Sequence, residues 1–226
     1  MKKTVIGAIA LLGALTVTPV TAKETISAVG SSSVTPLMEV FAETYMKTHN
    51  DVFIEVQGPG SSAGVKAAKN GSADLGMSSR NLKASEEEAT LKKEVIARDG
   101  IAVVVNPKNT LKALTAEQVT AIYKGEITNW KDVGGEDKPI VAITRDTASG
   151  TRGAFEDIMK LKKKISGKKV SAISPRAQVA SGNGALKTNV ASNPYAIGYI
   201  SLGTVDSSVQ ALSVDGTSAT VANVKN

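Results

Sequence analysis

The sequence has no cysteine and only one histidine, His49. The lack of cysteine excludes disulfide bonds and thiolate metal sites, and a single histidine leaves little basis for a histidine metal centre or a catalytic triad. Aromatic residues make up only 4% of the 226 residues, whereas hydrophobic residues make up 42%. Such a chain can bury a core of small apolar side chains, which favours α/β packing. We therefore expect neither a metal nor another cofactor.

The first 22 residues have the composition of a secretory signal peptide. A basic start, Met1–Lys3, precedes the apolar run Val5–Val17, and the small-residue segment Val20–Ala22 follows it. This apolar run is shorter than the roughly 20 residues that a membrane span requires, although a retained N-terminal anchor is the alternative. We expect cleavage after Ala22, no lipid anchor because there is no cysteine, and a mature protein in the periplasm.

The net charge gives little reason to expect a nucleic-acid partner. Removal of residues 1–22 takes away two lysines and leaves 25 basic and 21 acidic residues, a net charge of +4. Much of the excess lies in Lys160–Lys169, which reads KLKKKISGKK. A run of this kind is usually a solvated surface turn, and a nucleic-acid surface would normally add aromatic residues for base stacking.

Strands and helices alternate along the rest of the chain. Apolar runs predict strands over residues 25–29, 51–57, 73–77, 101–105, 140–143 and 196–200. Helical spacing or capping signals predict helices over residues 36–49, 64–70, 85–93, 115–123 and 151–161, with a glycine-broken loop and helix over 177–189. Residue Thr115 has Gln118 at the matching position of a capping box. This order implies sheets of parallel strands with helices on their faces.

Three polar loops rich in glycine and serine each follow a predicted strand and lead into a predicted helix. They are residues 30–36, GSSSVTP, residues 58–64, GPGSSAG, and residues 147–151, TASGT. The first turn of a helix has unpaired N–H groups and a partial positive charge, and serine hydroxyls add further donors. Together with Arg145 beside the third loop, they predict a site for one small oxyanion. Arg80 occupies a similar position after the strand at 73–77.

Two other readings of the second loop are weaker. Gly60–Gly64 fits the G-x-S-x-G pattern of a serine hydrolase, but that chemistry needs a downstream histidine and His49 lies upstream. The same loop fits a loose dinucleotide-binding pattern, G-x-G-x-x-A, with Pro59 inside the turn and no acidic residue at the usual spacing.

The sequence resembles the phosphate-binding proteins of bacterial phosphate ABC transporters along nearly all of the expected mature chain. The resemblance rests on residues 28–36, 58–65, 73–82, 121–135, 143–155 and 194–202, of which KGEITNWKDVGG and the arginine loop ITRDTASGTRGAF are the most specific. It implies an α/β periplasmic-binding-protein fold of type II, with two lobes joined by two crossing strands and the ligand in the cleft between them. Lobe 1 would comprise residues 23–104 and 198–226, and lobe 2 residues 105–197.

The resemblance also implies a function. The protein would bind inorganic phosphate, deliver it to the permease subunits of an ABC transporter, act as a monomer and have no enzyme activity. Phosphate contacts carried over from the family are Ser32, Ser33, Ser61, Arg145, Ser149, Gly150 and Thr151.

This sequence departs from the family at one position of the expected site. Familiar members have an aspartate where this chain has Ser79, followed by Arg80. A hydroxyl can accept the proton of a phosphate but does not repel sulfate as a carboxylate does. We include Ser79 and Arg80 in the expected site and hypothesise that Ser79 or a backbone carbonyl discriminates phosphate from sulfate. A receptor for sulfate, molybdate or arsenate, a serine hydrolase, and a sensor or adhesin on the same fold are the alternatives.

Overall fold

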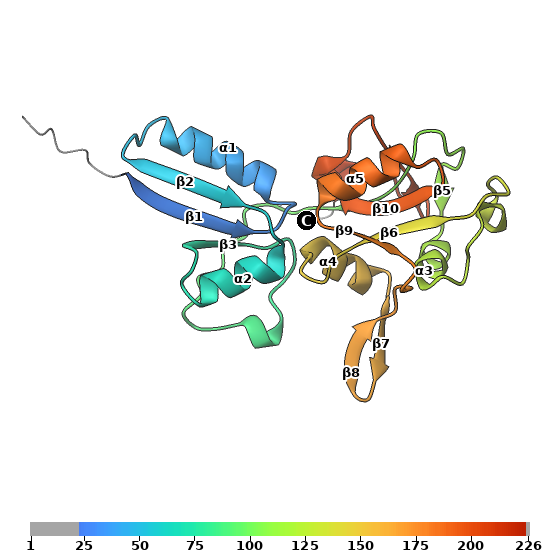
Figure 1. Cartoon of the computed structure of the whole chain (residues 1–226), viewed down its shortest axis with the longest axis horizontal. Coiled ribbons are helices and arrows are strands. Elements are labelled where there is room, and N and C mark those ends of the chain that lie inside the picture. Colours follow the sequence, from blue (N-terminus) through green and yellow to red (C-terminus); the bar gives the residue numbers. More distant parts are fainter. Residues whose placement is uncertain (1–22, 225–226) are drawn as a thin grey trace, which may run out of the picture.

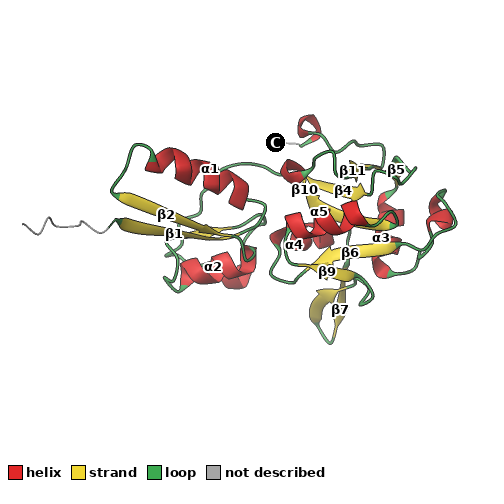
Figure 2. Cartoon of the chain, turned by 45° about the horizontal axis from the view of Figure 1, so that its top comes forward, coloured by secondary structure: helices red, strands yellow, loops and turns green. Residues whose placement is uncertain are grey.

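The computed structural model describes residues 23–224 and contains two α/β units (Figure 1). The signal peptide predicted for residues 1–22 lies outside the described residues. In the first unit, three parallel strands are arranged in the order β2-β1-β3. They are β1 (Glu24–Gly30), β2 (Val52–Gln57) and β3 (Leu75–Met77), with helix α1 (Thr35–Met46) on one side and α2 (Ser61–Lys69) on the other (Figure 2).

The second unit is built on a five-stranded sheet in the order β11-β4-β10-β6-β9. Its strands are β4 (Ile101–Val105), β6 (Val141–Arg145), β9 (Gln178–Ala180), β10 (Ala196–Ser201) and β11 (Gln210–Ala211). Helices α3 (Ala116–Lys124), α4 (Gly150–Ile158) and α5 (Asn183–Ser192) pack around it. All six residues of β10, AIGYIS, are buried, in line with its mostly apolar sequence and its place at the centre of the sheet.

Smaller elements complete the second unit. Strand β5 (Ala113–Leu114) pairs with β12 (Ser213–Val214), and β7 (Lys162–Ile165) forms a hairpin with β8 (Lys168–Ser171). Short 3-10 helices cover Ala84–Glu86, Trp130–Val133, Leu202–Thr204 and Val221–Asn223. No helix among the described residues is both long enough and apolar enough to cross a membrane.

The predicted lobe boundaries both fall inside paired strands. Residues 104 and 105 lie in β4, residues 197 and 198 lie in β10, and the two strands are antiparallel neighbours, with Ile197 opposite Val105. After β10 the chain stays with the second unit, because β11 pairs with β4 and β12 pairs with β5. The sequence predicted that residues 198–226 belong to lobe 1, whereas β11 and β12 in this segment pair with strands of the second unit.

Most predicted elements are present, and the capping box of Thr115 and Gln118 at the start of α3 is confirmed. The helix predicted for residues 85–93 is wrong, because only the single turn Ala84–Glu86 forms there. Charged side chains in this segment bind partners elsewhere: Glu86 binds Arg80 and Glu88 binds Lys69. A segment this short has little intrinsic helix stability and presents no apolar face that would pack.

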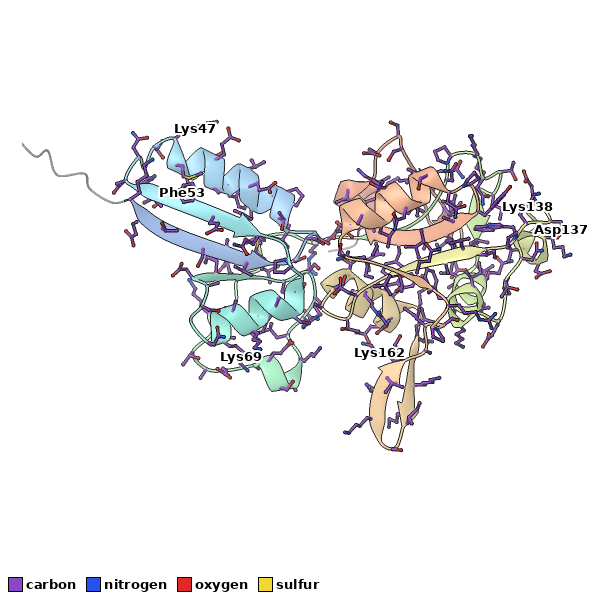
Figure 3. The ribbon with its side chains drawn as sticks, viewed as in Figure 1. Lys47, Phe53, Lys69, Asp137, Lys138 and Lys162 are labelled. Atoms are coloured by element: carbon purple, nitrogen blue, oxygen red, sulfur yellow. The ribbon has the colours of Figure 1, made fainter. Side chains whose placement is uncertain are left out.

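The apolar face of α1 is exposed. Leu37, Val40, Phe41 and Tyr45 have the predicted helical spacing but are 36% to 58% exposed. Phe53 on the neighbouring strand β2 is also exposed (Figure 3). Helical spacing therefore identified the helix correctly without indicating which face the core covers.

The basic segment at residues 160–169 forms most of the β7-β8 hairpin. Ser166 and Gly167 have φ values of 49° and 78°, as a tight two-residue hairpin turn requires. The hairpin projects from the body of the second unit (Figure 1), and Lys162 at its base binds Asp157 (Figure 3). Its lysines are largely exposed, in line with the expected solvated surface.

Candidate oxyanion-binding site

The three polar loops come together at the junction of the two units. Two of them follow β1 and β2 and lead into α1 and α2, and the third follows β6 and leads into α4. Figure 1 shows that these helices begin at the junction, where α5 also begins. The partial positive charges of four helix N-termini therefore face the same region, which favours a bound anion.

Direct contacts join the loops across the junction. The hydroxyl oxygens of Ser33 and Thr151 lie 2.9 Å apart, and the amide of Ser62 donates to the carbonyl of Ala148 at 3.0 Å. Gly150 lies against the first unit so closely that a Cβ atom there would collide with Ser61 Oγ. The glycine therefore lets the backbone of the third loop approach the second.

Arg145, the last residue of β6, is buried at the centre of the site. Only 1% of its surface is exposed. Its guanidinium donates through Nε to the carbonyl of Ala180 at 3.3 Å, through Nη1 to Asn183 Oδ1 at 2.9 Å, and through Nη2 to Ser32 Oγ at 3.3 Å. Its backbone amide donates to the hydroxyl of Tyr199 at 3.2 Å. Strand and side-chain contacts thus fix the guanidinium in one position.

The charge of Arg145 has no acidic partner within hydrogen-bond distance among residues 23–224. Burial lowers the pKa of its guanidinium, while the nearby Asp146 carboxylate raises it. Arginine nevertheless stays charged in proteins, and a buried charge is costly unless an opposite charge accompanies it. The protein environment around Arg145 is therefore suited to a bound anion.

The start of α4 supplies further donors. Ser149 caps this helix, because its hydroxyl accepts a hydrogen bond from the amide of Arg152 at 3.1 Å. The amides of Gly150 and Thr151 belong to the first turn, where N–H groups have no partner within the helix. Ser149 and Thr151 are both buried, with 4% and 3% of their surfaces exposed.

Ser79 and Arg80 differ in how they relate to this site. The amide of Ser79 donates to Ser61 Oγ at 3.1 Å, and the two hydroxyl oxygens are 3.4 Å apart, so Ser79 lies beside the second loop. Arg80 forms a two-pronged ion pair with Glu86, at 2.7 and 2.8 Å, and also donates to Ser62 Oγ at 3.1 Å. Its charge is thus compensated within the protein, and a direct role in ligand binding stays a prediction.

Sequence reasoning missed Asn183 as a site residue. It is 1% exposed, begins α5, accepts a hydrogen bond from Arg145 and donates Nδ2 to Ser33 Oγ at 2.8 Å. The available signal was the segment Gly182–Gly184, which follows a short strand and begins a helix as the other three loops do. Because β9 has only three residues, its apolar pattern was too short to mark this loop as equivalent.

The hydrolase interpretation of the second loop has no structural support. In the G-x-S-x-G pattern the central serine is Ser62, whose hydroxyl accepts a hydrogen bond from Arg80. His49 follows the C-terminal end of α1, where its ring stacks on Tyr45 and contacts Thr48. The histidine and the serine therefore have separate partners.

Comparisons with known proteins place the chain in a family. A model of the PBP superfamily domain matches residues 16–225. A Clostridium perfringens structure with bound phosphate, described as a phosphate ABC transporter substrate-binding protein, is 45% identical, with 89% of this chain and 80% of that chain covered and a TM-score of 0.82. A phosphate transport receptor from Vibrio cholerae is also 45% identical, with 88% and 80% covered and a TM-score of 0.70.

Curated relatives are longer than this chain. Phosphate-binding protein PstS of Borreliella burgdorferi is 31% identical over 80% of this chain and 64% of its own length. The first curated relatives are matched over 36% to 64% of their length. The breadth of the family match and the likeness to the Clostridium structure show that this protein belongs to the PBP superfamily and has its periplasmic-binding-protein-like fold.

Proposed function

We propose that this protein binds inorganic phosphate between its two α/β units and delivers it to the permease of an ABC transporter. The observation that carries the proposal is the buried guanidinium of Arg145, which lies among four helix N-termini without an acidic partner within hydrogen-bond distance in the described chain. The names of the relatives support phosphate as the anion, since those proteins are described as phosphate-binding.

The donors at the site are sufficient for tight binding. Ser32, Ser33, Ser61 and Thr151 offer hydroxyls, the start of α4 offers amides, and Arg145 offers a planar pair of N–H groups that matches two phosphate oxygens. Hydrogen bonds to a charged group contribute about 1.5–3 kcal/mol each, and a micromolar dissociation constant corresponds to about 8 kcal/mol. Several such bonds therefore provide the required free energy and offset desolvation of the anion.

The wider biological role belongs to the same proposal. We expect a monomer, exported to the periplasm, that binds its ligand without turnover and requires no cofactor. The two units would close around the anion, and the permease would recognise the closed form. The contacts between Ser33 and Thr151 and between Ser62 and Ala148 are of the kind that would stabilise closure.

Calorimetric titration tests the proposal. The protein is freed of bound anion by unfolding and refolding, then titrated with phosphate and sulfate at pH values on either side of the second ionisation of phosphate. We expect one phosphate per chain with micromolar or tighter affinity. Failure of phosphate to bind would refute the proposal, and equal binding of sulfate would replace it with a general receptor for tetrahedral oxyanions.

The role of Ser79 in selectivity is tested in the same assay. The variant Ser79→Ala removes the hydroxyl that would accept a proton from phosphate. If Ser79 discriminates, the ratio of phosphate to sulfate affinity should fall in this variant. An unchanged ratio would assign discrimination to another acceptor, such as a backbone carbonyl.

A further inference from the structure

Asn183 connects the central cation of the site to the first polar loop. It accepts a hydrogen bond from Arg145 Nη1 at 2.9 Å and donates one to Ser33 Oγ at 2.8 Å. Arg145 and Asn183 belong to the second unit, whereas Ser33 belongs to the first. A single buried amide thus contacts two predicted ligand-binding side chains from opposite sides of the junction.

The orientation of this amide is dictated by its neighbour. A guanidinium has five donors and no acceptor, so only the carbonyl oxygen of Asn183 can face Arg145. The NH₂ group must then point to Ser33, whose oxygen accepts from it. With the NH₂ group of Asn183 on one lone pair, the O–H of Ser33 can donate to a ligand or to Thr151 Oγ1, which lies 2.9 Å away.

Three other serine hydroxyls of the site also accept a hydrogen bond from an N–H group. Ser32 accepts from Arg145 Nη2 at 3.3 Å, Ser61 from the amide of Ser79 at 3.1 Å, and Ser149 from the amide of Arg152 at 3.1 Å. The O–H of Ser61 can donate to a ligand or to Ser79 Oγ, which lies 3.4 Å away. Fixed N–H groups therefore occupy one lone pair on each of four serines and leave each O–H for an acceptor such as an oxyanion.

We propose that Asn183 is a positioning residue that holds the guanidinium of Arg145 and sets Ser33 as a donor, so that the site presents donors to its ligand. This inference rests on the proposed phosphate site and deepens it. These donors match the unprotonated oxygens of a tetrahedral oxyanion, because a protonated oxygen there would bring a donor against a donor. Ser79 is not one of them and is left as the acceptor hypothesised for the single proton of HPO₄²⁻. Affinity for phosphate should therefore rise as the pH passes through its second ionisation.

The substitution Asn183→Asp tests the proposal with almost no change in shape. A carboxylate has no N–H to donate, so the O–H of Ser33 would turn toward residue 183, and the new charge would compensate Arg145. A carboxylate beside the bound anion would also repel it. We expect phosphate affinity to fall by at least about 100-fold. Thermal stability without phosphate should rise instead, because the buried guanidinium gains a counter-ion.

The expected fall in phosphate affinity and rise in thermal stability distinguish a positioning residue from a purely structural one. An asparagine that only supported the fold would lose stability and affinity together when replaced. The matched control is Asn189→Asp, which introduces the same charge at an exposed position of the same helix, α5. It should change phosphate affinity less than threefold and should not raise the melting temperature.

Three results would overturn the inference. The first is an Asn183→Asp variant whose phosphate affinity is within tenfold of that of a phosphate-binding wild type. The second is a parallel loss of stability and affinity in that variant. The third is a wild-type protein that binds no phosphate, which would refute the proposed function as well.

A second variant covers the case in which Asn183→Asp does not fold. Asn183→Ala keeps the net charge, removes both contacts and frees Arg145 and Ser33 to reorient. We expect about tenfold weaker phosphate binding from the loss of one charge-assisted hydrogen bond that held the guanidinium. Unchanged affinity in a folded Asn183→Ala protein would overturn the proposal.

Discussion

Replacement of Arg145 by lysine keeps the positive charge but removes the planar fork of donors. The guanidinium has five N–H donors. Three of them bind the carbonyl of Ala180, Asn183 Oδ1 and Ser32 Oγ, one from each nitrogen. Two donors therefore remain, one on each terminal nitrogen, and they can bind two oxygens of a phosphate.

The magnitude of the effect follows from counting donors. Lysine has three donors on one nitrogen, whereas the three protein acceptors and two phosphate oxygens need five. At least two hydrogen bonds to a charged group are lost, at about 1.5–3 kcal/mol each. The expected loss is about 3–6 kcal/mol, or about 10² to 10⁴ in the dissociation constant for phosphate.

Calorimetric titration with phosphate at fixed ionic strength measures this loss in Arg145→Lys. Arg176→Lys is the control, because it makes the same chemical change at an exposed residue outside the site. The control should bind like the wild type. An Arg145→Lys protein that binds phosphate within tenfold of the wild type would refute the bidentate role of Arg145.

Two further predictions concern closure and stability. Gly150→Ala places a Cβ against Ser61 Oγ and within 2.6 Å of Ser79 Oγ. This variant should bind phosphate about tenfold or more weakly, without a large change in melting temperature. Wild-type affinity for phosphate would contradict the close approach of the two units. Hydrogen bonds from Arg80 lower the pKa of Glu86 from its usual 4.5 to about 2, so its stabilising contribution is present above pH 4.5 and is lost as the pH falls toward 2. Glu86→Gln should therefore lower the free energy of unfolding at pH 7 by about 1–2 kcal/mol. In denaturant titrations, the difference from the wild type should shrink as the pH falls from 4.5 to 2. A difference that does not depend on pH would contradict a stabilising ion pair.

Much of the candidate site could be predicted from the sequence because its chemistry is local. Each of the three polar loops lies between a strand and a helix, and glycine and serine at that place signal exposed N–H groups whatever the rest of the fold. Strand–helix alternation likewise predicted the parallel pairing of β1 with β2 and β3 and of β6 with β9 and β10, but not the antiparallel pairing of β4 with β10 and β11. Local pattern and local chemistry were therefore sufficient for these features.

Features that depend on distant contacts could not be predicted in this way. Asn183 gains its importance from Arg145 and Ser33, which are 38 and 150 residues away in the sequence. Arg80 resembled Arg145 in its position after a strand, but its ion pair with Glu86 sets it apart. Composition alone does not show which of two arginines has an acidic partner.

Tertiary contacts and turn geometry also account for the differences in secondary structure. Residues 85–93 have the charge order of a helix, but Glu86 and Glu88 bind Arg80 and Lys69 outside the segment, and tertiary contacts determine the outcome. The hairpin at residues 162–171 has lysine on both strands, which is unusual for strands, and forms because Ser166 and Gly167 adopt the left-handed conformation of a tight turn.

A crystal structure of the protein grown with phosphate would show whether Arg145 binds the anion. We expect one phosphate at the junction of the two units, within hydrogen-bond distance of the Arg145 guanidinium, the amides of Gly150 and Thr151, and the hydroxyls of Ser32 and Ser33. Phosphate bound at saturating concentration in another place, or contacts that leave Arg145 uninvolved, would contradict this expectation.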